Sequence, residues 1–332
     1  MNIDITLTTF NYTVTLPRAG IRQLRGSLLA QALELEPNIP EIKLSGPDVK
    51  PEHLDVIAKM VRQEKLDLII PESYIQAARY LNWPLLDALS SGYYHMLLEF
   101  SPNLNIYRPE TYGPALAWSI VNRYESLTQH ILQVTDPSPM DAQALILAAA
   151  THTPSIVKFL LTRVDPVTAT IPRHVLFLWQ PLKAIDMQNI YQVVQRDHVN
   201  HFLEGEGNYA FRLACAAMVP EVNFPSFARM TLAHLLADER VRNTAPLQKA
   251  LEMAVKSSAR ILLNFLLEET DVDPNIEVKM PVMNMLPGDF ETKTVTLIDF
   301  ALQFDQIQEA RMLAQCPRTK VSESMQNLLE YL

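Results

Sequence analysis

The sequence is poor in glycine, with 8 glycines among 332 residues against 23 prolines. That is about a third of the usual glycine content, whereas proline exceeds its usual share of about 5%. Hairpin turns and nucleotide-binding loops need glycine because their backbones adopt positive φ angles or lie close to a ligand. The shortage therefore disfavours all-β sandwiches and nucleotide-binding α/β folds, and it favours helices joined by short turns bounded by proline.

The sequence also lacks a cysteine framework, an excess of positive charge and long apolar runs. Cys215 and Cys316 are the two cysteines and lie far apart, which excludes a disulfide framework and favours a reducing compartment. The net charge is −9 and no region is rich in Lys and Arg, so nucleic acid is not an expected partner. No stretch approaches the roughly 20 apolar residues of a membrane span, and the N-terminus lacks a signal-peptide pattern. We therefore expect a cytoplasmic protein with no membrane partner.

The composition is that of a folded protein with more than one part. Hydrophobic residues make up 48% of the chain and charged residues 20%, which excludes a mainly disordered protein. The length suits two or three compact domains, or one domain followed by a short solenoid.

The first ninety residues combine strand and helix patterns. Apolar and polar residues alternate over residues 3–8 and 10–16, but the phase changes at Thr8-Thr9. A turn there would place both apolar sets on one face, which predicts a hairpin that ends at Pro17. Helical spacing follows over residues 19–35, then a short strand at 42–44, then three helices that begin near residues 51, 71 and 85. The sequence thus predicts a small α+β domain over residues 1–91.

This order of elements resembles the BTB/POZ fold. Three stretches carry the resemblance in the family's order: residues 11–33, 42–61 and 73–91. The resemblance implies a domain that self-associates as a homodimer or recruits a cullin-type ubiquitin ligase. In cullin-binding members, a hydrophobic residue, any residue and an acidic residue follow the long helix. Ile39, Pro40 and Glu41 occupy this place here, so the resemblance implies that they bind a partner.

The chain after about residue 111 repeats one pattern. A helix rich in small residues, such as Ala148–Ala150 or Ala214–Ala217, precedes a helix that ends in paired leucines near Leu161, Leu236 or Leu267. A pair of helices cannot bury its apolar faces alone, so small residues on the first helix let neighbouring pairs stack closely. The pattern predicts an all-α solenoid with about five or six units of roughly 30–35 residues. Residues 191–203 could end one further unit, and a single irregular helical domain is the alternative.

These helix pairs resemble degenerate ankyrin repeats. The stretches that carry the resemblance are ALILAAATHTPSIVKFLL and ALEMAVKSSARILLNFLLEETDVDPN. The chain lacks the family's Thr-Pro-Leu-His box and its glycine before the second helix, where Thr153-Pro154 and Ser257-Ser258 stand instead. The resemblance implies a surface that captures a protein client.

An insert at residues 276–295 interrupts the helical series. Residues 276–279 and 290–295 are expected to pair as a hairpin across the turn at Pro287-Gly288-Asp289. Inserts in repeat arrays map to one face, often the binding face. The methionines of the insert are therefore candidate partner contacts, with core filling as the equal alternative; they are Met280, Met283 and Met285.

Aromatic residues gather where the two predicted regions meet. Tyr112, Trp118 and Tyr124 lie on or beside the first helix of the repeat region, and Tyr93-Tyr94 end the preceding part. We expect these rings to bury that first helix against the N-terminal region.

No motif of a catalytic, cofactor or metal site is recognisable. Gly205–Ala210 has the letters of a dinucleotide fingerprint but follows a helical stretch, so a loop is expected. His198 and His201 have the spacing of a metal-binding pair but no third ligand nearby. Neither cysteine lies beside a histidine that would activate it. We therefore expect no enzyme and assign no catalytic, cofactor-binding or metal residue.

The sequence thus predicts a BTB/POZ-like domain at residues 1–91, a helical linker at 92–110 and an ankyrin-like helical-repeat solenoid at 111–332. This architecture implies a non-enzymatic scaffold or adaptor that links a client on the repeats to a cullin-type ubiquitin ligase or to a self-associated copy. The combination also resembles the repeat proteins of large DNA viruses of amoebae. That resemblance implies the alternative, a virion-associated structural or host-interaction protein in the host cytoplasm or the virion.

Overall fold

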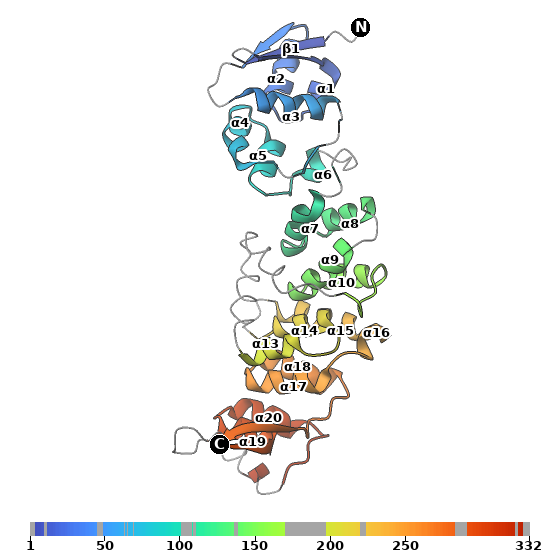
Figure 1. Cartoon of the computed structure of the whole chain (residues 1–332), viewed down its shortest axis with the longest axis vertical. Coiled ribbons are helices and arrows are strands. Elements are labelled where there is room, and N and C mark those ends of the chain that lie inside the picture. The colour runs from blue at the N-terminus through green and yellow to red at the C-terminus, as the bar shows by residue number, and fades with distance from the viewer. Residues whose placement is uncertain are drawn as a thin grey trace. The chain divides into compact units, whose positions relative to one another are not determined.

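A computed structural model describes most of the chain, with gaps: residues 4–9, 12–44, 49–62, 64, 66–68, 70–100, 108, 111–135, 139–169, 197–219, 224–282, 291–322 and 325–327. It divides into two compact units, Met1–Ser138 and Pro139–Leu332 (Figure 1). The described residues are mostly helical, with a three-stranded sheet near the N-terminus. This content agrees with the predicted α+β region followed by a helical region. The division falls after the first helix pair of the repeat region, so this pair groups with the N-terminal unit.

The N-terminal sheet contains the predicted hairpin and the predicted third strand. Strand β1 (Asp4–Thr9) pairs antiparallel with β2 (Tyr12–Pro17) and parallel with β3 (Glu41–Lys43). The phase change at Thr8-Thr9 coincides with the end of β1, as predicted. The buried residues of the two hairpin strands face each other in the pairs Ile5–Leu16 and Leu7–Val14. One face of the sheet therefore belongs to the core.

Short helices complete the core of the first unit. They are α1 (Arg18–Arg22), α2 (Leu28–Leu35), α3 (Pro51–Arg62), a 3₁₀ turn (Glu72–Tyr74), α4 (Ile75–Tyr80), α5 (Pro84–Ser90) and α6 (Leu97–Phe100). Helix α2 begins at Ser27, whose hydroxyl accepts a hydrogen bond of 3.1 Å from the Ala30 amide and so caps the helix. Helices α1 and α3 touch at Gly20, where a Cβ would lie 2.5 Å from Val61 Cγ1. Glycine at this position therefore allows the close approach.

The helix pair α7 (Tyr112–Val121) and α8 (Glu125–Val134) packs against the end of the N-terminal region. The Trp118 ring lies 6.1 Å from the Tyr94 ring and 5.0 Å from the Tyr124 ring, measured between centroids. Trp118, Tyr94 and Tyr112 are all buried, and burial raises the pKa of Tyr94 to about 12. The contact of Trp118 with Tyr94 confirms that the first helix packs against the N-terminal region, whereas Tyr93 and Tyr124 are 55% and 46% exposed.

Eight described helices of the second unit form pairs, and the pairs pack on one another in series. The pairs are α9 (Pro139–Ala150) with α10 (Pro154–Leu161), α14 (Tyr209–Ala216) with α15 (Pro225–Ala237), α17 (Leu247–Lys256) with α18 (Arg260–Glu269), and α19 (Leu297–Gln303) with α20 (Ile307–Gln315). The second helices contact in the order α10, α15, α18 and α20 (Figure 1). The alanines predicted to lie between pairs, Ala148–Ala150 and Ala214–Ala217, are buried. This arrangement is the stacking that the sequence pattern predicted.

Helix α13 (Asp197–Glu204) stands apart from this series. It packs on α14 and α17, whereas α9 packs directly on α14 and α10 directly on α15. The helix at the end of residues 191–203 is therefore not the second member of a pair stacked between α10 and α15. The short helix α16 (Glu239–Arg242) follows α15.

One turn geometry joins the helices of four pairs, α7–α8, α9–α10, α17–α18 and α19–α20, although glycine is absent from it. The turn residues with positive φ are Arg123 (59°), His152 (51°), Ser258 (54°) and Asp305 (58°). In each case the next amide donates to the carbonyl five residues earlier, for example Thr153 to Ala148 at 3.0 Å and Gln306 to Ala301 at 2.8 Å. This is the αL-capped helix end that glycine usually provides. A non-glycine residue in this conformation costs on the order of 1 kcal/mol.

The predicted insert is a hairpin. Strand β4 (Glu277–Val282) pairs antiparallel with β5 (Glu291–Thr296), and Val278 faces Val295. Met280 is 2% exposed and belongs to the core beneath the hairpin, so its side chain is not a surface contact. Met283 and Met285 lie outside the described residues.

The left-handed turn makes a testable prediction at Asp305, an exposed residue. Asp305→Gly should raise the free energy of unfolding by about 0.5 kcal/mol, and Asp305→Val should lower it by about 1 kcal/mol, because only the first relieves the strain at positive φ. Urea denaturation followed by circular dichroism measures both values. Gln303→Gly, two residues earlier and in helical conformation, should be destabilising. A loss of stability in Asp305→Gly equal to that in Gln303→Gly would contradict this assignment.

Candidate partner-binding site

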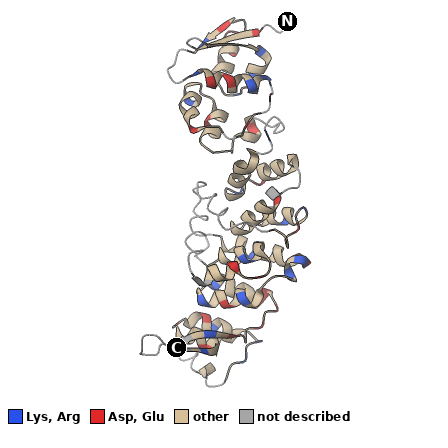
Figure 2. Ribbon diagram, viewed as in Figure 1, with Lys and Arg blue, Asp and Glu red and all other residues tan. Residues whose placement is uncertain are grey.

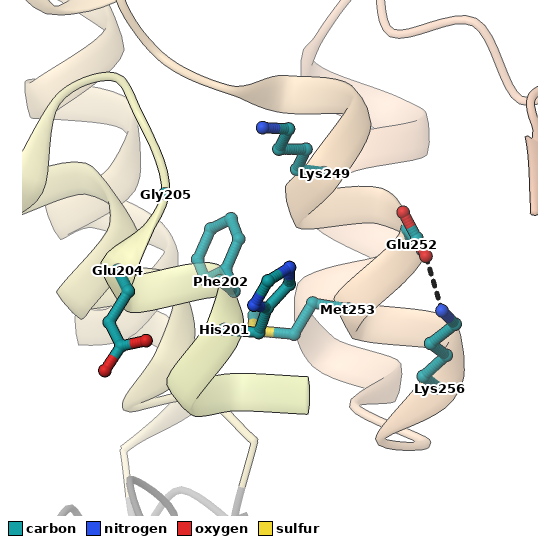
Figure 3. Close-up of a pocket in the computed structure, with 8 residues that line it drawn as sticks. All are labelled: His201, Phe202, Glu204, Gly205, Lys249, Glu252, Met253 and Lys256. Atoms are coloured by element: carbon teal, nitrogen blue, oxygen red, sulfur yellow. Dashed lines mark hydrogen bonds and ion pairs between the residues drawn. The ribbon is translucent and has the colours of Figure 1, made fainter. Parts of the chain in front are cut away.

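The second unit contains a pocket between α13 and α17 with a volume of about 520 Å³ (Figure 3). This size lies within the range of sites that accept ligands or inserted side chains. The residues that line it are His201, Phe202, Glu204, Gly205, Lys249, Glu252, Met253 and Lys256.

The pocket has an apolar floor and a charged, solvent-exposed rim. Phe202 of α13 is 6% exposed and Met253 of α17 is 3% exposed, whereas His201 and Lys249 are exposed. The spacing of Lys249, Met253 and Lys256 places them on one face of α17. Figure 3 shows His201 and Lys249 on the two facing helices, with Phe202 beside them. The pocket can therefore accept an apolar group that carries a polar or charged neighbour.

Only part of the charge around the pocket is internally neutralised. Lys256 forms an ion pair with Glu252 one turn earlier, and its ammonium lies 5.9 Å from the Phe300 ring centroid. The Glu204 carboxylate is directed away from Lys249 and His201 (Figure 3). Within the described part of the chain, the Lys249 side chain has no ion pair or hydrogen bond. Among the described residues that line the pocket, Lys249 is therefore the cation that remains available to a ligand.

A buried arginine holds the α13 wall of the pocket in place. The Arg212 guanidinium of α14, in a residue 6% exposed, donates to the carbonyls of Phe202 at 3.2 Å, Leu203, and Gly207 at 3.3 Å. It also lies 5.4 Å from the Tyr209 ring centroid, and burial lowers its pKa. The last carbonyls of a helix have no partner within the helix. Arg212 supplies those partners and so fixes the end of α13, which carries Phe202.

The segment that resembles a dinucleotide fingerprint is the loop between α13 and α14, as expected from its context. Gly207 has a φ of 102°, and a Cβ there would lie 2.6 Å from the Thr244 carbonyl oxygen. The Asn208 side chain accepts from the Phe211 amide at 2.9 Å and donates to the Pro166 carbonyl at 2.8 Å. These residues serve the loop and the start of α14, not a phosphate.

Ile39 and Pro40 lie in the first unit between α2 and β3, and Glu41 is the first residue of β3. Ile39 is half-buried, Pro40 is exposed, and Glu41 is half-buried. The Thr8 hydroxyl donates to Glu41 at 2.9 Å, and the Lys43 ammonium lies 3.7 Å from the Glu41 carboxylate. The acidic side chain therefore already has two partners in the free chain.

The neighbouring residues of α2 extend this surface. Leu28 and Leu35 lie two turns apart on one face of the helix and are 41% and 88% exposed. Arg18 holds the connection to β3 by donating to the Pro37 and Ile39 carbonyls. The first unit thus presents a fixed edge with exposed apolar side chains.

Charges of both signs are distributed over the helices of both units (Figure 2). No group of three His, Cys, Asp or Glu side chains suited to a metal ion occurs among the described residues. His201 lines the pocket, while the side chain of His198 lies outside the described ones. Sequence reasoning did not find Arg212 or the pocket. The one available signal was an arginine within the otherwise small and apolar helix YAFRLACA.

Comparison with known proteins finds no matching family model, no matching curated protein and no matching solved structure. In the described parts of the chain, every helix is too short or too polar to cross a bilayer.

Arg212 provides a test of how the pocket wall is held. Arg212→Met should lower the free energy of unfolding by about 3 kcal/mol, because buried carbonyls lose a charged donor. Arg229→Met is the matched control: Arg229 pairs with Glu268 and Glu269 at the surface, so its loss should cost less than about 1 kcal/mol. Urea denaturation of the two variants measures the difference. Equal effects would show that Arg212 does not hold α13.

Proposed function

We propose that this chain is a non-enzymatic scaffold or adaptor that holds a protein client on its helix pairs and uses its N-terminal domain to engage a second partner. The observation that carries the proposal is the pocket between α13 and α17, which combines an apolar floor with an unmatched lysine. Stacked helix pairs bury their faces against one another and leave side chains at their edges for partners.

The arrangement of the second unit supports an ankyrin-like solenoid. Four described features agree with it: small buried residues on first helices, second helices in contact in series, turns of one geometry, and a hairpin insert. The absence of glycine from the turns is compatible with this fold because Ser258 and Asp305 adopt the required backbone conformation. The client is proposed to bind this unit.

The N-terminal unit supports a BTB/POZ-like domain that recruits a cullin or a second copy of the chain. The hairpin, the helices after it and the returning strand β3 occur in the order that the resemblance requires. Ile39 and Pro40 lie at the surface edge where cullin binding is proposed. The exposed leucines of α2 offer a second, apolar contact.

Cullin recruitment makes a prediction at Ile39 and Glu41. The double variant Ile39→Ala/Glu41→Ala should reduce capture of a cullin from host lysate by about tenfold, the effect of losing roughly 1.4 kcal/mol of binding free energy. Quantitative mass spectrometry of affinity-captured material measures the reduction, while far-UV circular dichroism should stay unchanged.

Glu36→Ala is the matched control for the double variant, because Glu36 is an exposed acidic residue between α2 and the proposed contact. The Glu36→Ala variant should capture as much cullin as the unaltered chain does. If the double variant also captures as much cullin as the unaltered chain, Ile39 and Glu41 are removed from the proposal. Recovery of the chain in virions without ubiquitin machinery would favour the structural alternative.

Self-association through the N-terminal domain makes a separate prediction. Leu28→Asp/Leu35→Asp should convert a dimer to a monomer, because charge on both exposed leucines opposes burial of the α2 face. Size-exclusion chromatography with light scattering gives the molar mass of each form. Val167→Asp, at a residue 44% exposed in the second unit, should leave the mass unchanged. A monomer in the unaltered chain would exclude the homodimer.

A further inference from the structure

The pocket between α13 and α17 has a chemistry that specifies its ligand more closely than a general client surface. Its floor is formed by Phe202 and Met253, which are both nearly fully buried. This apolar surface is unfavourable to hydrate. Methionine adapts its shape to different apolar groups. An aliphatic or aromatic side chain inserted between the helices would cover this floor.

The charge beside the floor favours an anion over a cation. Glu252 and Lys256 neutralise each other, and the carboxylate of the rim residue Glu204 is directed away from Lys249 (Figure 3). Lys249 has no such partner among the described residues. Among the described lining residues, the Lys249 ammonium therefore borders the α13–α17 cavity without a matching acid.

The shape of the site favours a peptide segment over a free small molecule. Small-molecule sites bury most of their ligand, whereas the described residues that line this pocket come from two helices and one loop, and its rim residues His201, Glu204 and Lys249 are exposed. A side chain from a partner protein needs only one covered face, because contacts elsewhere in the interface add to its binding.

We propose that this pocket binds an acidic peptide segment of the client: an apolar side chain enters between Phe202 and Met253, and a neighbouring Asp or Glu pairs with Lys249. This inference rests on the proposed scaffold function and names the partner chemistry of one site on it. Lys249 acts here as a specificity-determining residue, because an amide or basic neighbour on the peptide would leave its ammonium unpaired.

The experiment selects random displayed nonapeptides on the immobilised full-length chain and measures the Kd of the enriched peptides by fluorescence anisotropy. Enriched sequences should contain Asp or Glu next to Leu, Met or Phe. Lys249→Glu should weaken their binding by at least tenfold. Lys249 is exposed, so the substitution should not disturb folding.

Lys279→Glu is the matched control because it makes the same change in net charge at an exposed residue of β4. It should change the Kd by less than twofold. Enriched peptides without acidic residues, or binding that is equally affected by the two variants, would overturn the pocket assignment and leave the scaffold proposal standing. Failure to enrich any peptide would also overturn the assignment. The scaffold proposal falls on a different result, namely the absence of any partner in affinity capture.

Discussion

The structure depends on how its helices end. A helix leaves its last carbonyl groups without partners, and a buried helix end must find donors for them. Many proteins meet this need with glycine, which is scarce here. This chain uses two substitutes: non-glycine residues in left-handed turns, and arginine side chains that reach the carbonyls of a neighbouring helix.

The arginine contacts recur at equivalent places in the second unit. Arg240 donates to the Leu161 carbonyl at 2.8 Å at the end of α10, and Arg318 donates to the Leu267 carbonyl at 2.6 Å near the end of α18. Each arginine follows the second helix of the next pair along the chain. The contact therefore closes one helix and ties successive pairs together. Arg212 has the same chemistry at α13, but there it is buried and holds the end of the helix that forms one wall of a pocket.

Sequence reasoning predicted the elements whose residues carry a local signal. The phase change at Thr8-Thr9 predicted the first hairpin, because a strand alternates with a period of two and a turn must restore the buried face. Alanine-rich first helices predicted close stacking, and Trp118 was correctly expected to pack against the N-terminal region. Left-handed turns at Ser258 and Asp305 were not predicted, since no intrinsic preference of serine or aspartate requires them. Arg212 was not predicted either: the arginine within the helix YAFRLACA is the one signal, and its backbone-carbonyl partners cannot be read from the sequence.

The candidate site could not be predicted from the sequence because it forms only where α13 packs on α17. Phe202 and Met253 read as ordinary core residues, and only the placement of α13 on α17 turns them into a floor. Lys249 is identified as the unpaired cation only because the structure shows that Glu252 pairs with Lys256 instead. Which lysine pairs with Glu252 depends on side-chain geometry, and the spacing of residues along the chain does not determine that geometry.

The charge of the whole chain bears on how an acidic segment would reach this pocket. A net charge of −9 opposes the approach of an acidic peptide at long range. At physiological ionic strength, however, charges more than about 8 Å apart are largely screened, so the local contact decides the bound state. Added salt would weaken both the distant repulsion and the contact with Lys249, and the two effects partly cancel in the affinity. The proposed contact of an acidic segment therefore needs one lysine and an apolar anchor, and it does not need the strongly basic surface that would also attract nucleic acid.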